Sequence, residues 1–119
     1  MTVLAAYRTD PARLRHLVRG MAVLDRAAFT RLYEALSPAV TAGLTALMTD
    51  PARAREFTAA AFVEAWQTAN AHTADEDVAG WITGVAMMLA LEAGPDTEAD
   101  DEPVDRLASL LAGGRSQLC

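Results

Sequence analysis

The sequence predicts an all-α domain, because helical periodicity runs through almost the whole chain. No convincing stretch alternates apolar and polar residues with the period of a strand. Asp-Pro or Ser-Pro steps recur where one periodic segment gives way to the next. With 119 residues, of which 52% are hydrophobic, the chain is long enough to bury a core as one domain. We therefore expect a compact bundle of about five to six helices.

The first predicted helix follows an amino-terminal stretch, residues 1–9, that is expected to be at most an ordered arm. Asp10 can accept hydrogen bonds from the first turn, and Pro11 loses no needed donor at the first helical position. Gly20 is expected to end this helix. Its arginines form a basic face that is either simply solvated or a contact surface for an acidic partner.

The second helix is predicted to begin at Asp25 and to bury an apolar stripe that includes Phe29, Leu32 and Tyr33. Ser37-Pro38 is expected to stop it and to start a third helix, because proline disfavours α geometry in the residue that precedes it. The third helix would then run to Thr49.

The two helices between Asp50 and Glu92 carry most of the large aromatic residues. Asp50-Pro51 starts a helix that is expected to reach about Asn70. The next helix is expected to open near Thr73, where Thr73-Ala74-Asp75-Glu76 fits a capping box. Val78 to Leu91 carries no charge, is too short to span a bilayer and is typical of a buried helix.

The carboxyl-terminal part changes in composition after this pair. We expect residues 1–93 to form the helical domain, 94–102 an acidic linker and 103–119 a short helix with a tail. Pro103 is expected to start that helix and Gly113-Gly114 to end it.

Charge is unevenly distributed. The net charge of −6 divides into +3 over residues 1–35, −5 over 36–95 and −4 over 96–119. Affinity for phosphate depends on clustered cations, so the chain is not expected to bind DNA beyond weak contacts of its arginine-rich first third. All ten basic residues are Arg, which favours a GC-rich, actinobacterial origin.

Residues with catalytic or metal-binding chemistry are sparse. Cys119 is the single cysteine, which is typical of a reducing cytoplasm, and no signal peptide is evident. His16 and His72 have no neighbouring ligand residues, and there is no glycine-rich phosphate loop. We therefore expect a cytoplasmic protein that is not an enzyme and holds no metal and no cofactor.

Four short motifs follow one another in an informative order. A D-x-x-A-F-x-x-L-Y pattern starts at Asp25, and a D-P-x-x-A step lies at Asp50. An A-x-E-x-x-x-x-x-F-x-x-x-W pattern then covers residues 54–66, and G-W-I-T-G-V-A-M-M covers 80–88. In order and spacing, residues 25–91 resemble the second conserved region of extracytoplasmic-function sigma factors. That resemblance implies a helical domain whose scaffold residues here are Phe29, Leu32, Tyr33, Phe57, Phe62, Trp66, Trp81 and Val85.

In the family, this region binds the clamp helices of RNA polymerase and melts the promoter. The family's acidic pair is Arg55-Glu56 here, its polymerase-facing Gln is Ala59, and its Arg-Asn pair is Met87-Met88. The resemblance stops before the family's carboxyl-terminal helix-turn-helix domain, which this chain is expected to lack. Scaffold residues are kept while DNA-facing residues are lost. The candidate partner-binding residues are Arg55, Glu56, Ala59, Val63, Met87 and Met88.

Three functions remain open at this point. The favoured one is a degenerate sigma-like regulator that binds RNA polymerase, a sigma factor or another regulator and does not recognise promoters. The second is a reduced but working sigma factor that docks on the clamp helices. The third is a helical domain that self-associates, as a homodimer for example, and whose resemblance is coincidental.

Overall fold

The computed structural model describes residues 10–48, 50–74, 77–93 and 102–116, and these residues form an all-α bundle, as predicted. The arm over residues 1–9, the linker residues 94–101 and the tail over 117–119 with Cys119 lie outside the described residues. The described helices are α2 (Pro11–Ala22), α3 (Arg26–Met48), α4 (Pro51–Thr68), the 3₁₀ helix η1 (Ala69–Ala71), α5 (Val78–Ala93) and α6 (Glu102–Ser116).

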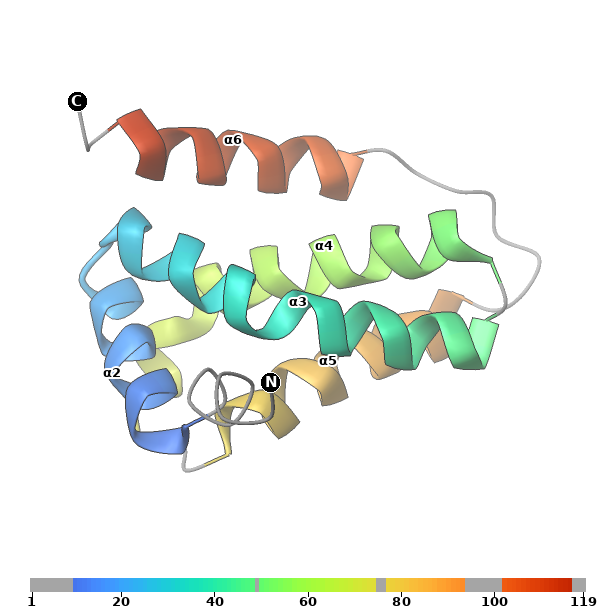
Figure 1. Cartoon of the computed structure of the whole chain (residues 1–119), viewed down its shortest axis with the longest axis horizontal. Helices are drawn as coiled ribbons and strands as arrows, with labels where there is room; N and C mark the ends of the chain where they lie inside the picture. The colour runs from blue at the N-terminus through green and yellow to red at the C-terminus, as the bar shows by residue number, and fades with distance from the viewer. Residues whose placement is uncertain (1–9, 49, 75–76, 94–101, 117–119) are drawn as a thin grey trace, which may run out of the picture.

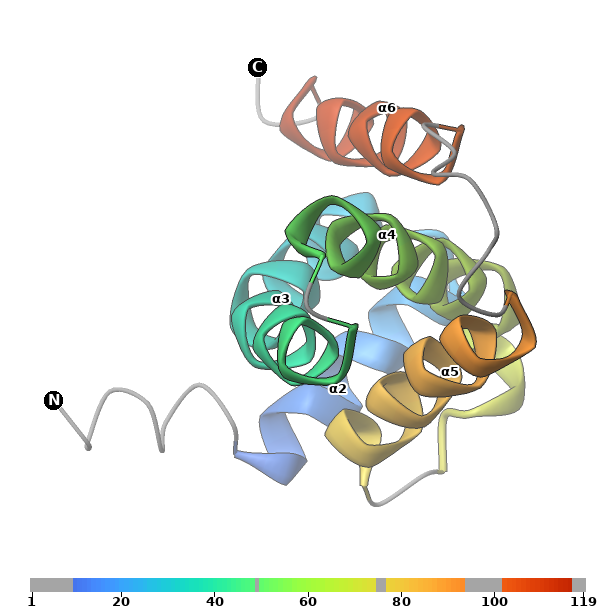
Figure 2. The ribbon, with the colours of Figure 1, turned by 90° about the vertical axis from the view of Figure 1, so that its right-hand side faces the viewer.

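Helix α4 is the central element of the bundle. It packs against α3, α5 and α6, while α2 crosses the end of the bundle and contacts α3, α5 and η1 (Figure 1). Viewed along the bundle, α3 and α5 flank α4 on one side and α6 covers it on the other (Figure 2). The described helices, α6 included, therefore share one core.

Helix α3 is a single helix of 23 residues, so the predicted break at Ser37-Pro38 is wrong. Proline removes one backbone hydrogen bond from a helix interior, yet Pro38 is solvent-exposed and its ring displaces nothing from the core. Leu36, Val40 and Leu44 are buried along one stripe that continues through the proline. Burial of this stripe holds both halves of α3 on the same axis and outweighs the lost hydrogen bond.

Gly20 does not end α2, contrary to the prediction, because the helix continues to Ala22. The backbone instead reverses at Leu24, whose φ of 66° lies in the left-handed region. The Gly20 carbonyl accepts hydrogen bonds from the N–H groups of Val23 (3.1 Å) and Asp25 (2.9 Å). A β-carbon at position 20 would approach the Ala28 Cβ to 2.8 Å, so glycine here permits α2 to pack closely on α3.

Three of the predicted helix starts are confirmed by their hydrogen bonds. The side chains of Asp10, Asp25 and Asp50 each accept from a backbone N–H two residues further on, at 3.0–3.2 Å. The bonds satisfy first-turn donors that would otherwise lack a partner. In α2 and α4 a proline occupies the next position, as expected.

The start predicted for α5 is wrong. The helix begins at Val78, and Asp77 is its cap, because the Asp77 carboxylate accepts from the Gly80 N–H at 2.9 Å. Residues 75–76 of the expected capping box lie outside the described residues. The ring of His72, just after η1, stacks on Trp81 in the first turn of α5, with centroids 4.0 Å apart.

Helix α6 begins at Glu102 and continues through the glycine pair to Ser116, one residue earlier and several residues longer than predicted. A glycine pair raises the free energy of a helix but supplies no physical stop unless the backbone turns left-handed there. The end of α5 at Ala93 lies one residue beyond the predicted end.

Candidate functional site

Two aromatic residues of α3 and two of α4 form one cluster. Phe29 packs edge-on against Phe62 and Trp66, with ring centroids 6.5 and 5.5 Å apart, and Tyr33 packs against Phe62 at 5.1 Å. Such edge-to-face pairs stabilise beyond their buried area. Among the scaffold residues inferred from sequence, Phe29, Leu32, Phe57 and Phe62 are buried, and Tyr33, Trp66, Trp81 and Val85 pack partly buried against the core.

Trp81 has a ring large enough either to stack on a nucleic-acid base or to pack against the core. Its ring is partly buried and lies nearly parallel to the His72 ring, with an interplanar angle of 16°. One face of the indole is therefore already covered from within the chain. This arrangement favours a structural role, because a stacking platform for a nucleic-acid base needs an open face.

The candidate partner-binding residues of α4 differ in accessibility. Arg55 is exposed, but Glu56 and Val63 are each 7% exposed and Ala59 is 1% exposed. Sequence reasoning expected these positions on an open surface. Helix α6 runs along α3 and α4 and buries its Leu107 in the shared core, and this cover was not anticipated because the amphipathic stripe of α6 does not reveal where it docks.

Arg53 is a residue of this face that sequence reasoning missed. Its Nε lies 3.6 Å from Glu56 Oε1, and both side chains are only 9% exposed. The Arg53 guanidinium also lies over the Phe57 ring, 5.1 Å from its centroid. The sequence indicates both contacts, because Glu56 and Phe57 follow Arg53 by three and four residues and therefore lie beside it on the helix. Glu56, the one acidic residue retained from the family's pair, is therefore engaged inside the chain.

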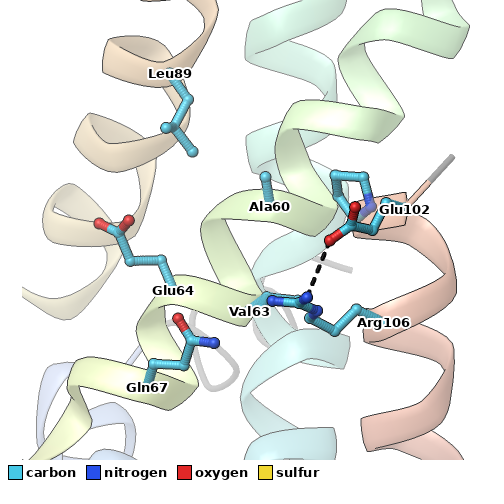
Figure 3. A pocket seen from close by; sticks show the side chains of 8 residues that line it. Ala60, Val63, Glu64, Gln67, Leu89, Glu102 and Arg106 are labelled. Atoms are coloured by element: carbon cyan, nitrogen blue, oxygen red, sulfur yellow. Dashed lines mark hydrogen bonds and ion pairs between the residues drawn. The ribbon is translucent and has the colours of Figure 1, made fainter. Parts of the chain in front are cut away.

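A shallow pocket of about 200 Å³ lies over α4, between α5 and α6 (Figure 3). It is lined by Ala60, Val63, Glu64 and Gln67 of α4, Leu89 of α5, and Glu102, Pro103 and Arg106 of α6. Arg106 donates to Glu102 at 2.9 Å across an exposed turn of α6. The lining mixes small, apolar and solvated polar side chains, and it brings together no nucleophile with a neighbouring base.

A second hollow of about 390 Å³ lies between α2 and α3, lined by His16, Arg19 and Arg31 among others. These three side chains are exposed, so the hollow is a solvated basic surface. Within the described ranges no group of three or more His, Cys, Asp or Glu is placed to hold a metal ion.

Helix α5 has an apolar surface on both sides. Val78, Ile82, Ala86 and Ala90 face the core and are buried. The opposite side, which we call the α5 face, consists of Gly80, Gly84, Met87, Met88 and Leu91, all solvent-exposed. Met88 is 60% and Leu91 74% exposed. The prediction that Val78–Leu91 is a buried helix is therefore wrong for one of its two sides.

Leu91 was not among the predicted binding residues. The sequence does indicate it, because Leu91 follows Met88 by three residues and Met87 by four. In a helix this spacing places all three on one face. Met87 and Met88 are both exposed, as a candidate contact surface requires, and Met87, at 36%, is the less exposed of the two.

Comparison of the chain with protein-family models, curated proteins and solved structures gave no match. The resemblance to the sigma-factor region thus stays a prediction from motif order. Of the helices described, none combines the length and the hydropathy that a membrane span needs.

Proposed function

We propose that this chain is a sigma-like regulatory protein that acts by binding another protein of the transcription machinery, without recognising a promoter itself. RNA polymerase, a sigma factor or another regulator is the partner class. The motif order from Asp25 to Leu91 supports the link to transcription. The observation that carries the mode of action is the α5 face, an exposed apolar surface at the positions where the family has polar, DNA-facing residues.

The charge distribution supports binding of protein rather than DNA. Between Val78 and Leu91 there is no cation, and Glu92 follows directly. Capture of single-stranded DNA requires cations along the backbone together with open aromatic faces. One face of Trp81 is covered by His72, so α5 offers no cation and at most one open aromatic face.

A working sigma factor is the less favoured alternative. The family contacts the polymerase clamp through the α4 positions matched here by Glu56 and Ala59, and both are buried. Contact through these positions would first require helices packed on α4 to move. Self-association is the third candidate function, and the α5 face is the surface on which it would depend.

Two assays on the full chain test this proposal. A pull-down with purified core polymerase and with purified sigma factors should retain the protein, and a mobility-shift assay with promoter fragments at moderate salt should show no specific complex. A promoter-specific complex, or transcript from a run-off reaction with core polymerase, would instead support the working sigma factor. Absence of binding to every component would contradict the proposal.

A further inference from the structure

The α5 face is unusual because a helix on a protein surface normally turns polar side chains to solvent. Here the solvent side of α5 carries two glycines, two methionines and a leucine over residues 80–91. The stripe is about 17 Å long, or three turns. A helix that is apolar on all sides is typically enclosed by protein. The half of α5 that the bundle leaves exposed thus has the composition of an interface.

The shape of the face fits a second helix. A β-carbon at Gly84 would meet no atom within 4 Å, so the backbone is open to close approach at the middle of the stripe. Met87, Met88 and Leu91 rise beside it and provide flexible, polarisable contacts. Helices that pack through such ridges lie about 8–10 Å apart. A partner helix can therefore approach the α5 backbone closely at Gly84.

The charges at both ends of the stripe identify the partner's chemistry. Asp77 precedes the α5 face and Glu92 follows it, and both are exposed. A second copy of the chain that paired α5 with α5 in antiparallel fashion would place these acids against each other, and the segment from residue 36 to 95 has a charge of −5. Like charges across an interface are unfavourable, whereas opposite charges provide specificity.

We propose that the α5 face binds an amphipathic helix of another protein, whose apolar stripe is flanked at both ends by Lys or Arg. This inference rests on the proposed function for the use of α5 as the contact surface, and it adds the chemistry of the partner. Binding follows the helix-in-groove mode, in which a few apolar anchors supply affinity and the flanking charges select the partner.

The probes are three designed peptides of about five helical turns. The first has a Leu/Met stripe flanked by Lys, the second has the same stripe flanked by Glu, and the third is a scrambled version of the first. Fluorescence anisotropy against the full-length chain should show binding of the Lys-flanked peptide, at least about tenfold tighter than the Glu-flanked one. Affinity should fall as salt is raised.

Two glycine variants locate the contact. Gly84→Leu fills the open space at the centre of the α5 face, and Gly43→Leu fills equally open space on the exposed side of α3. Leucine is a better helix former than glycine, so both variants should fold. We expect Gly84→Leu to weaken peptide binding by about tenfold or more and Gly43→Leu to leave it unchanged.

Charge variants test the flanks. Asp77→Asn keeps a good helix cap while it removes the charge. Glu92→Gln removes the charge at the exposed carboxyl-terminal end of α5. The double variant should lose most of the preference for Lys-flanked over Glu-flanked peptide.

Three outcomes would each overturn the inference. They are equal affinity of the wild-type chain for the Lys-flanked and Glu-flanked peptides, equal effects of the two glycine variants on peptide binding, and a dimer in light scattering that Gly84→Leu dissociates. No polymerase enters this assay, so its failure is distinct from failure of the pull-down that tests the proposed function.

Discussion

Leu24 shows how a single residue ends one helix and directs the chain into the next. Its φ of 66° is left-handed, and its side chain is 71% exposed, so no core contact compensates for the strain. A left-handed residue with a β-carbon is less stable than glycine in the same conformation by about 1–2 kcal/mol. The turn is maintained by the hydrogen bonds to the Gly20 carbonyl and not by the choice of residue.

Leu24→Gly should therefore raise the free energy of unfolding, by about 0.5–1 kcal/mol after allowance for the greater chain entropy of unfolded glycine. Urea unfolding followed by circular dichroism measures it. Val23→Gly is the matched control, because Val23 has a φ of −106° and gains nothing from glycine. An increase in stability for both variants would contradict the strain argument.

At the scale of the element, Pro38 shows that a local rule can be overridden by burial. The proline removes one hydrogen bond of α3, while the stripe of Leu36, Val40 and Leu44 keeps the helix continuous. Pro38→Ala should restore the bond to the carbonyl of Glu34 and stabilise the protein by about 1–3 kcal/mol. Thermal unfolding tests this, and a lowered midpoint would show instead that α3 is adapted to the proline.

The cap of α5 is a second prediction at this scale. Asp77→Ala removes the acceptor of the Gly80 N–H and should destabilise the protein by about 1 kcal/mol. Thr73→Ala, at the start predicted from sequence, should have a much smaller effect because α5 begins at Val78. If chemical denaturation ranks the two variants in the opposite order, the helix begins earlier than described.

Features that depend on neighbouring residues could be predicted from the sequence, whereas features that depend on contacts between helices could not. Asp10, Asp25 and Asp50 were predicted as caps because capping is local and the motif includes all the atoms that take part. The aromatic stripe of α3 and α4 was also readable, since periodicity alone places Phe29 and Phe62 on apolar faces. The continuity of α3 through Pro38 and the start of α5 depend on tertiary packing, which the local pattern does not contain.

The same distinction applies to the candidate site. Met87 and Met88 could be identified because they stand where the resembling family has an Arg-Asn pair. Leu91 belongs to the same face and was missed, because the uncharged segment Val78–Leu91 was expected to be buried. Burial of Glu56, Ala59 and Val63 could not be predicted, because it depends on how the other helices pack on α4, which the local sequence pattern does not contain.

At the scale of the whole molecule, α6 has the fewest fully buried residues of the described α-helices, and its Val104, Leu110 and Leu111 pack partly buried against the core. Leu107 is its one buried residue among those whose side chains are described, whereas α2, α3, α4 and α5 each bury four or more. Burial of one leucine contributes about 1.5–3 kcal/mol. Elements with few buried contacts open at a free energy below that of global unfolding.

Hydrogen exchange should therefore report opening of α6 before the rest of the bundle. Leu107→Ala should accelerate exchange in α6 and leave the amides at the α3–α4 contact protected, with an opening free energy lower by about 2–3 kcal/mol. Ser109→Ala, on the exposed side of α6, is the control and should change little. Uniform acceleration throughout the bundle would show that α6 unfolds together with the core.

The two exposed methionines of the α5 face make this surface sensitive to oxidation. Met88, at 60% exposure, is accessible to mild oxidants, and its sulfoxide would place a strong dipole in the middle of an otherwise apolar stripe. Peroxide treatment should modify Met88 more readily than the buried Met21, as mass spectrometry of the two sites would show. Oxidised protein should bind the Lys-flanked peptide more weakly, and methionine sulfoxide reductase should restore binding, so contact through this helix would depend on the oxidation state of its surroundings.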